Sequence, residues 1–177
     1  MKKKTIWDLG RMSAEEFKQA DKLPLILVLD NVRSLSNVGA MLRTADGFGL
    51  LKVILCGVTG CPPSPEIHKT ALGAEDSVDW VYESDTVEVV KSLKADGVKV
   101  CVLEQVEHSV SLEDFVPAPE TSYALVVGHE VNGVSQEVVD NADICLEIPQ
   151  FGTKHSLNVS VSAGIAMWQF LSSSLKS

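Results

Sequence analysis

Apolar runs alternate with amphipathic segments along most of the chain. Six short, mostly apolar runs are expected to be strands: 25–29, 51–56, 78–82, 98–103, 123–127 and 143–148. Apolar residues at helical spacing predict the helices between them, near 37–48, 67–72, 87–93, 134–139 and at the end of the chain. Because strands covered on both sides are continuously apolar, this order predicts an α/β fold with a parallel sheet and helices on both faces.

A polar arm precedes this body. Ser13 and Glu16 are spaced as a capping box, which predicts one short helix, and Phe17 offers an apolar side chain to hold that helix to the body. We expect two parts, the arm at 1–23 and one domain at 24–177, which is long enough to bury a core.

Composition and charge limit which classes of protein this chain can belong to. A chain with 45% hydrophobic and 22% charged residues is globular rather than disordered. No apolar run is long enough for a membrane span, and the basic start lacks the apolar stretch of a signal peptide, so we expect a cytoplasmic protein. The formal net charge of −9 does not favour nucleic-acid binding, because phosphate affinity comes largely from Lys and Arg. Any RNA binding therefore requires a local basic patch or a second subunit.

The cysteines do not form a metal motif. Cys56 and Cys61 flank a short loop with His68 further on, but the spacing lacks a second pair of ligands. We therefore expect no metal, and interpret the cysteines as small core residues in a reducing compartment. The absence of clustered His and carboxylate residues also disfavours a metal-dependent hydrolase.

Polar residues follow three of the expected strands, at the sheet edge where ligands of parallel α/β proteins collect. The first group follows 25–29, and in it Asn37 or Ser36 is placed to cap a helix. Gly39 and Arg43 lie four residues apart on one face of that helix, which predicts open space beside the arginine. A solvent-exposed arginine with no ligand is the alternative.

The second group, Gly128 to Gly133, follows the run at 123–127 directly. Its glycines bracket Glu130 and are expected to let a ligand approach backbone N–H groups closely. Because the middle residue is Glu, the loop is not a dinucleotide-binding fingerprint.

The third group begins after the last expected strand. Pro149 ends that strand, Gly152 allows a sharp turn, and Ser156 stands where we expect the helix N-cap, with Asn158 in the first turn. The apolar residues that follow at helical spacing are Leu157, Val161, Ile165 and Trp168. The alternative is an ordinary connection between a strand and a capped helix.

Together the three groups resemble the SpoU branch of the SPOUT superfamily, RNA ribose 2′-O-methyltransferases that use S-adenosylmethionine. The first family motif is present as Asn37, Gly39, Arg43 and Thr44. The second is present as Gly128, Glu130 and Gly133. The third is present as Ile148, Pro149, Ser156, Leu157, Asn158, Val159 and Ser160. The resemblance extends from about residue 24 to residue 171.

The resemblance implies that the C-terminal part of the sheet forms a deep trefoil knot, one of the rare exceptions to unthreaded folds. It implies S-adenosylmethionine binding by Leu103, Glu104, Val127, Gly128, Ile148 and Leu157. It implies catalytic roles for Arg43, Asn37, Glu130, Ser156 and Asn158. It also implies a homodimer, with RNA crossing the subunit boundary and contacting Arg33, Arg43, Lys69 and Lys154. For Lys69 and Lys154, solvated surface charge is the alternative.

The role of Arg43 stays open at this point. In the family it is a base or an activator, but a guanidinium remains protonated until about pH 12 or above. A clamp on an RNA phosphate suits the same side chain equally well.

Two further functions are weighed against ribose methylation. One is a non-catalytic RNA-binding or ribosome-assembly factor that keeps the knotted fold, and the other is methylation of a base nitrogen. The RNA is also open between tRNA and rRNA, because many relatives carry an additional N-terminal RNA-binding domain and only the short arm precedes the domain here.

Overall fold

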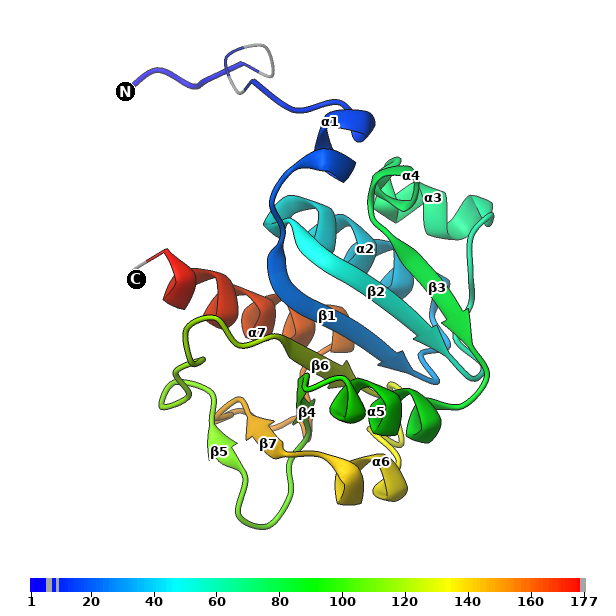
Figure 1. Cartoon of the computed structure of the whole chain (residues 1–177), viewed down its shortest axis with the longest axis vertical. Helices are drawn as coiled ribbons and strands as arrows, with labels where there is room; N and C mark the ends of the chain where they lie inside the picture. Colours follow the sequence, from blue (N-terminus) through cyan, green and yellow to red (C-terminus); the bar gives the residue numbers. More distant parts are fainter. Residues whose placement is uncertain (6–7, 9, 176–177) are drawn as a thin grey trace.

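The computed structural model describes residues 1–5, 8 and 10–175. Within this part of the chain, all strand pairs belong to one seven-stranded parallel sheet of order β3-β2-β1-β6-β4-β7-β5 (Figure 1). The strands are β1 (Leu23–Asp30), β2 (Leu50–Cys56), β3 (Trp80–Glu83), β4 (Lys99–Leu103), β5 (Val110–Ser111), β6 (Tyr123–Val127) and β7 (Ile144–Glu147). The helices are α1 (Ala14–Gln19), α2 (Leu35–Phe48), α3 (Pro65–Ala71), α4 (Ala74–Ser77), α5 (Thr86–Ala95), α6 (Gln136–Asn141) and α7 (Val159–Ser174).

These elements confirm the predicted parallel α/β fold, and all six predicted strands are present. The additional strand, β5, has two residues and pairs with β7 at the sheet edge, so it is too short to produce an apolar pattern. Helix α6 begins two residues later than predicted, with Ser135 at its N-cap. The trefoil knot stays a prediction.

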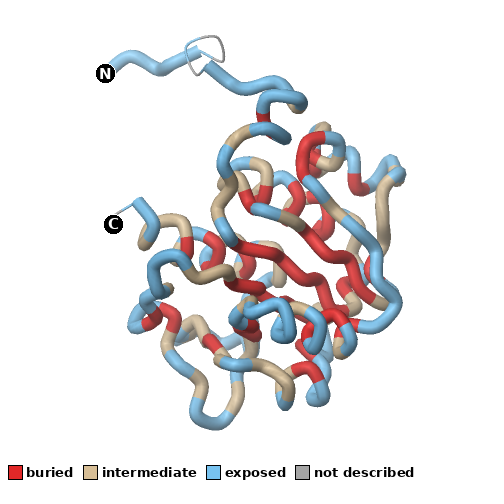
Figure 2. The backbone as a smooth tube through the Cα atoms, viewed as in Figure 1, coloured by how far each residue is buried: buried red, intermediate tan, exposed pale blue. Residues whose placement is uncertain are grey.

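The central strands divide the core into two layers. Leu25, Leu27 and Leu29 of β1 pack in the cluster that also contains side chains of α2, α3 and α7. Ile26 and Val28 pack in the second cluster, against α5 and α6 on the other face (Figure 1). Because both faces are covered, β1 is buried along most of its length, as Figure 2 shows.

Helix α2 presents the predicted residues to the core. Val38, Leu42 and Ala45 are fully buried, which confirms the face expected from their spacing. The helix begins two residues earlier than expected because Ser34 is its N-cap, and the Ser34 side chain accepts the N–H of Asn37.

The arm carries the expected short helix. Ser13 and Glu16 form both hydrogen bonds of a capping box at the start of α1, which confirms that prediction. Phe17 is 9% exposed, and the ammonium group of Lys22 lies 3.0 Å from its ring centroid. The division into an arm and a domain 24–177 stays a prediction, and residues 176–177 lie outside the described residues.

None of the helices in the described part of the chain is both long enough and apolar enough to cross a membrane.

Candidate functional site

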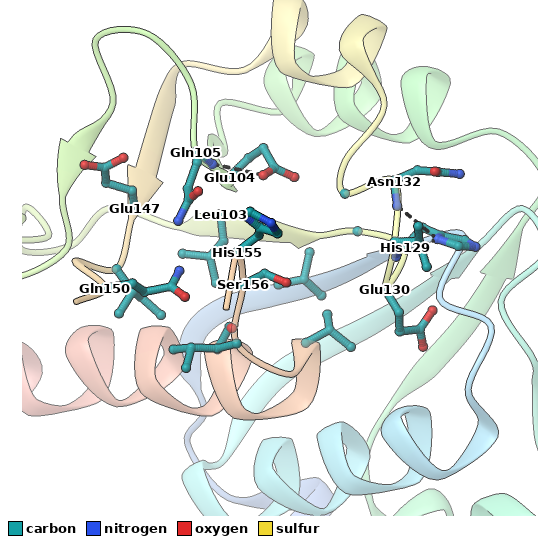
Figure 3. A pocket seen from close by; sticks show the side chains of 18 of the residues that line it. Leu103, Glu104, Gln105, His129, Glu130, Asn132, Glu147, Gln150, His155 and Ser156 are labelled. Carbon is teal, nitrogen blue, oxygen red and sulfur yellow. Dashed lines mark hydrogen bonds between the residues drawn. The ribbon is translucent and has the colours of Figure 1, made fainter. Parts of the chain in front are cut away.

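A cavity of about 290 Å³ lies at the edge of the sheet where β4, β6 and β7 end (Figure 3). Its walls come from the loops that follow these three strands and from the start of α7. The volume is at the lower end of the range for small-molecule sites, about 300 to 1,000 Å³. The cavity brings together all six residues expected to contact the cofactor: Leu103, Glu104, Val127, Gly128, Ile148 and Leu157. Their role as cofactor ligands stays a prediction.

Glu104 holds two of the walls together. Its carboxyl oxygens accept hydrogen bonds from the backbone N–H of Val134, at 2.9 Å, and of Gln105, at 3.0 Å. A β-carbon on Gly133 would lie 2.0 Å from one of these oxygens, and Gly133 has a φ of +67°. Glycine at this position therefore lets the loop after β6 pack directly on Glu104.

The loop after β6 also closes on itself. His129 and Gly133 form an antiparallel bridge, with N···O distances of 3.0 and 2.8 Å. A β-carbon on Gly128 would lie 2.2 Å from the carbonyl carbon of Gly133. The N–H groups of residues 129 and 131–134 are all bonded within the chain. At these five positions the prediction that the glycines leave backbone N–H groups open to a ligand is not met, because the protein itself accepts the bonds; for the N–H groups of residues 128 and 130 it stays a prediction.

The space beside Gly39 is also filled by the protein itself. A β-carbon there would lie 2.1 Å from the hydroxyl oxygen of Thr70 and 2.4 Å from the carbonyl oxygen of Ile67, both on α3. The Thr70 hydroxyl donates to the carbonyl oxygen of Ser36 at 3.1 Å. The prediction of open space for an approaching group beside Arg43 is wrong, because the glycine makes room for α3 to pack closely on α2.

Glu130 connects the loop after β6 to the start of α2. One carboxyl oxygen accepts from the backbone N–H of Ser34 at 2.9 Å and from the side-chain amide of Asn37 at 3.1 Å. The other accepts from the backbone N–H of Arg33 at 3.1 Å. In Figure 3 the Glu130 side chain extends toward α2. The first and second polar groups are thus joined by one carboxylate.

These contacts set the charge of Glu130. Partial burial disfavours the ionised form, but the N–H groups of Ser34 and Arg33 and the Asn37 amide outweigh it and lower the pKa of Glu130. A carboxylate of low pKa is a weak proton acceptor, so this geometry suits positioning rather than proton transfer.

The third polar group, before and at the start of α7, is connected to the other two through Asn37. The side-chain oxygen of Asn37 accepts from the Asn158 amide at 3.2 Å. The side-chain oxygen of Asn158 accepts from the backbone N–H of Ser160 and of Val161, at 2.9 and 3.3 Å. Glu130, Asn37 and Asn158 therefore form a hydrogen-bonded chain that links all three groups.

The start of α7 differs from the prediction. Asn158 is the N-cap, not a residue of the first turn, and Ser156 is not the cap. The physical reason is that the Asn158 side chain reaches two free N–H groups of the helix while its amide still bonds Asn37. Ser156 consequently stays in the loop, where it lines the cavity.

The basic side chains lie outside this cavity. Arg43 is exposed on α2, Lys69 is exposed on α3, and Lys154 is exposed in the loop before α7. Arg33 lines a second cavity on the other side of the loop after β6. The roles expected for these four residues, and the catalytic roles, stay predictions.

The cavity also contains polar residues that the sequence did not single out, notably Gln105, His129, Asn132, Gln150 and His155. Each lies in or beside one of the loops that follow strands. Their closeness in sequence to Glu104, Glu130 and Ser156 could have indicated that they lie near the cavity. Because loops have no regular periodicity, the sequence does not indicate which loop side chains point into it.

Metal ligands are not clustered in the described residues, where no group of three or more His, Cys, Asp and Glu side chains could hold an ion. All four cysteines are free. Burial raises the pKa of the Cys56 and Cys101 thiols to about 12, so both remain protonated. For these two, the interpretation as core residues is confirmed.

The chain is thus a parallel α/β protein with a cavity at the carboxyl edge of its sheet, where three polar motifs converge. Comparison with known proteins shows which family has these features. The chain belongs to the SpoU rRNA Methylase family, whose model matches residues 24–168.

Individual relatives agree with this assignment. The 23S rRNA (guanosine-2′-O-)-methyltransferase RlmB of Neisseria meningitidis is 32% identical over 144 residues, which are 81% of this chain and 56% of that protein. The A. aeolicus TrmH/SpoU tRNA modifying enzyme superposes with a TM-score of 0.81 at 26% identity, covering 92% of this chain and 83% of that one. An AdoMet-bound rRNA methyltransferase from Sinorhizobium meliloti has a TM-score of 0.78 at 26% identity, with coverages of 87% and 59%. The chain spans little more than half the length of the curated relatives it matches.

Proposed function

We propose that this chain is an S-adenosylmethionine-dependent methyltransferase that methylates a ribose 2′-hydroxyl in structured RNA. The observation that carries the proposal is the chain from Glu130 through Asn37 to Asn158, which assembles all three family motifs beside one cavity. Family membership supports it, as do the activity named for the N. meningitidis relative and the AdoMet bound in the S. meliloti structure.

The cavity suits the proposed cofactor chemically. Leu103, Val127, Ile148 and Leu157 supply apolar walls, and Glu104 and Gln105 supply polar groups at one end. S-adenosylmethionine, when bound, supplies an electrophilic methyl group. The protein's part is to hold a ribose in line with that group and to accommodate the proton that the 2′-hydroxyl loses, and alignment accounts for much of such a rate.

The residues divide this work unequally. Glu130 is a fixed hydrogen-bond acceptor that positions Asn37 and the start of α2. Ser156 lines the cavity, and we assign its hydroxyl a contact with the substrate. Arg43 is exposed and acts as the base or as a clamp on an RNA phosphate, and Arg43→Lys separates these roles. Survival of most activity favours a point charge on phosphate over the planar guanidinium.

A homodimer belongs to the same proposal. Four apolar residues at the start and along one side of α7 remain exposed: Leu157 at 39%, Val161 at 51%, Ile165 at 41% and Trp168 at 51%. An apolar stripe of this kind is typical of an interface. A second subunit also pools basic residues, which an acidic chain needs in order to bind RNA.

We also propose that the protein acts in the cytoplasm, as its four free cysteines favour a reducing compartment.

Methyl transfer from labelled S-adenosylmethionine tests the function. Unmodified tRNA and 23S rRNA transcripts are offered separately and then digested with alkali. A 2′-O-methyl group blocks cleavage of the neighbouring linkage, so we expect label in alkali-resistant dinucleotides. The label should be lost with Arg43→Ala and Asn158→Ala and kept with Lys91→Ala, a matched exposed position on α5.

Other outcomes point elsewhere. Label in mononucleotides moves the acceptor to a base. Failure of the wild-type protein to bind S-adenosylmethionine by calorimetry contradicts the proposal and favours a non-catalytic RNA-binding or assembly factor.

A further inference from the structure

A second cavity lies behind the loop after β6. It is bordered by the ends of β1 and β6 and by residues before α2 and α6. Its lining residues are Asp30, Asn31, Arg33, Val58, His129, Asn132, Gly133 and Ser135. Three of these, His129, Asn132 and Gly133, also line the proposed cofactor cavity, so the loop after β6 is a shared wall. In Figure 3 His129 and Asn132 extend from this loop on the side away from His155.

The hydrogen bonds of His129 decide where its ring proton sits. Its Nδ1 atom accepts from the backbone N–H of Val131 at 3.0 Å and of Asn132 at 3.2 Å. An atom that accepts two N–H groups carries no proton, which assigns the proton of the neutral ring to Nε2. His129 therefore caps the loop with one nitrogen and offers an N–H donor with the other.

Three further side chains of this cavity are donors without partners, whereas Asn31 is bonded to Asp30 and to the backbone N–H of Val58. In the described part of the chain, the guanidinium of Arg33, the amide of Asn132 and the hydroxyl of Ser135 make no hydrogen bond or ion pair. Arg33 is held by its own backbone N–H, which Glu130 accepts at 3.1 Å, so the side chain is free to reach a ligand.

The one carboxyl group in the lining does not oppose this donor set directly. Asp30 is 2% exposed. Its oxygens accept from Thr86 at 2.6 Å, from Asn31 at 2.8 Å and from the backbone N–H of Ser135 at 3.0 Å. Its acceptor capacity is thus directed into the fold.

We propose that this second cavity binds a phosphodiester of the substrate RNA adjoining the methylated nucleotide, through Arg33, the Nε2–H of His129 and Asn132. The inference rests on the proposed function for the identity of the ligand. One guanidinium with several neutral donors suits a phosphate, which accepts hydrogen bonds on two free oxygens and carries one negative charge. Because the two cavities share the loop after β6, this phosphate would lie next to the ribose that is held in line with the cofactor in the first cavity.

Two substitutions at His129 separate the donor from the cap. An Asn side chain places its oxygen where Nδ1 lies, so His129→Asn keeps a local cap on Val131 and Asn132 but removes the Nε2 donor. A Gln side chain reaches further, so His129→Gln offers an N–H near the Nε2 position and loses the cap. Arg33→Gln removes the cation, and Lys91→Gln removes one positive charge from an exposed position on α5 that does not line this cavity, as the control.

Filter binding of unmodified tRNA and 23S rRNA transcripts across a range of salt concentrations, with S-adenosylhomocysteine present, is the test. For Arg33→Gln we expect binding to weaken about tenfold and the slope of log K against log salt to fall by about 0.7 to 0.9, as for one lost phosphate contact. For His129→Asn we expect weaker binding with an unchanged slope and an unchanged melting temperature, because a neutral donor is lost. For His129→Gln we expect a lower melting temperature with part of the RNA affinity regained. Lys91→Gln should match the wild type.

Each result decides something. Wild-type affinity and slope in both Arg33→Gln and His129→Asn overturn the proposal, as does a wild-type protein that binds neither RNA. Equal slope changes in Arg33→Gln and Lys91→Gln also overturn it, since the effect is then one of overall charge. A slope change specific to Arg33, in a protein that transfers no methyl group, leaves this site standing and contradicts the proposed function instead.

Discussion

Both faces of α7 are apolar, and two of the four residues on its buried face are alanines. The buried residues are Ala163, Ala166, Met167 and Phe170. The exposed apolar residues are Val161, Ile165 and Trp168. Hydrophobicity alone therefore does not distinguish the side of this helix that faces the core.

Packing against the core explains which side of α7 is buried. Ala163 and Ala166 are fully buried where α7 packs on the core, and a β-carbon on Gly164 would make an ordinary contact, 4.0 Å from a methyl carbon of Thr44 on α2. Further along, the ring of Phe170 lies 5.3 Å from the rings of both Phe115 and Tyr123. A helix that is apolar on both sides needs a partner on both sides. The core covers one face, and our proposal assigns the other to a second subunit.

The largest expected effect comes from the buried face. Met167→Ala should lower the free energy of unfolding by about 2 to 5 kcal/mol, because the fully buried side chain leaves a cavity. Urea denaturation measures it. An equal loss of unfolding free energy in Trp168→Ala, measured on dilute protein, would contradict the contrast between the two faces.

The next effect concerns Glu130, which holds the start of α2 and is linked to the start of α7 only through Asn37. Glu130→Gln should cost about 1 to 3 kcal/mol at neutral pH, because the charged acceptor of three hydrogen bonds is lost. The pKa of Glu130 in the folded protein lies below its ordinary value of 4.5, so its stabilisation is present above that pH and is lost as the pH falls through the folded pKa.

The difference in unfolding free energy between wild type and Glu130→Gln should therefore shrink between pH 6 and pH 3.5, about one unit below the ordinary pKa. Urea denaturation at several pH values measures it. A difference that is constant over this range would show that the Glu130 contacts do not depend on its charge.

A smaller effect is expected at the cap of the helix. Asn158→Ala should lower the free energy of unfolding by about 0.5 to 2 kcal/mol, as for other N-caps. Asn158→Asp keeps the capping oxygen but removes the amide that donates to Asn37. If Asn158→Asp is as stable as wild type but loses methyl transfer, the link to Asn37 serves the site rather than the helix.

The smallest effect on the isolated chain is expected on the exposed face. Ile165→Ser should change the unfolding free energy of dilute protein by no more than about 0.5 kcal/mol. At higher concentration the melting temperature of the wild type should rise, and that of Ile165→Ser should not, because only a dimer is stabilised by mass action. Sedimentation at the same concentrations checks the oligomeric state.

Much of the fold was predictable because it depends on local pattern. The apolar runs located every strand of more than two residues, and the spacing of Val38, Leu42 and Ala45 identified the buried face of α2. The six residues expected to contact the cofactor do line the cavity, and they were predictable from the family resemblance rather than from periodicity, whereas polar lining residues such as Gln105 and His155 were not. Glycine positions were misinterpreted, since a sequence indicates that space is needed at Gly39 and not that α3 fills it.

The amino-acid pattern of this chain is sufficient to specify its elements, its parallel sheet and the three polar groups at strand ends. That Glu130, Asn37 and Asn158 bond to one another, and that Arg33 and His129 border the same second cavity, depends on the strand order β1-β6-β4-β7, which brings distant loops together. Strand order is a non-local property, because it is selected by how whole layers pack and not by any single segment. The same packing decided which side of α7 is buried, since Ala163, Ala166, Met167 and Phe170 fit against the core although the opposite side of the helix is also apolar.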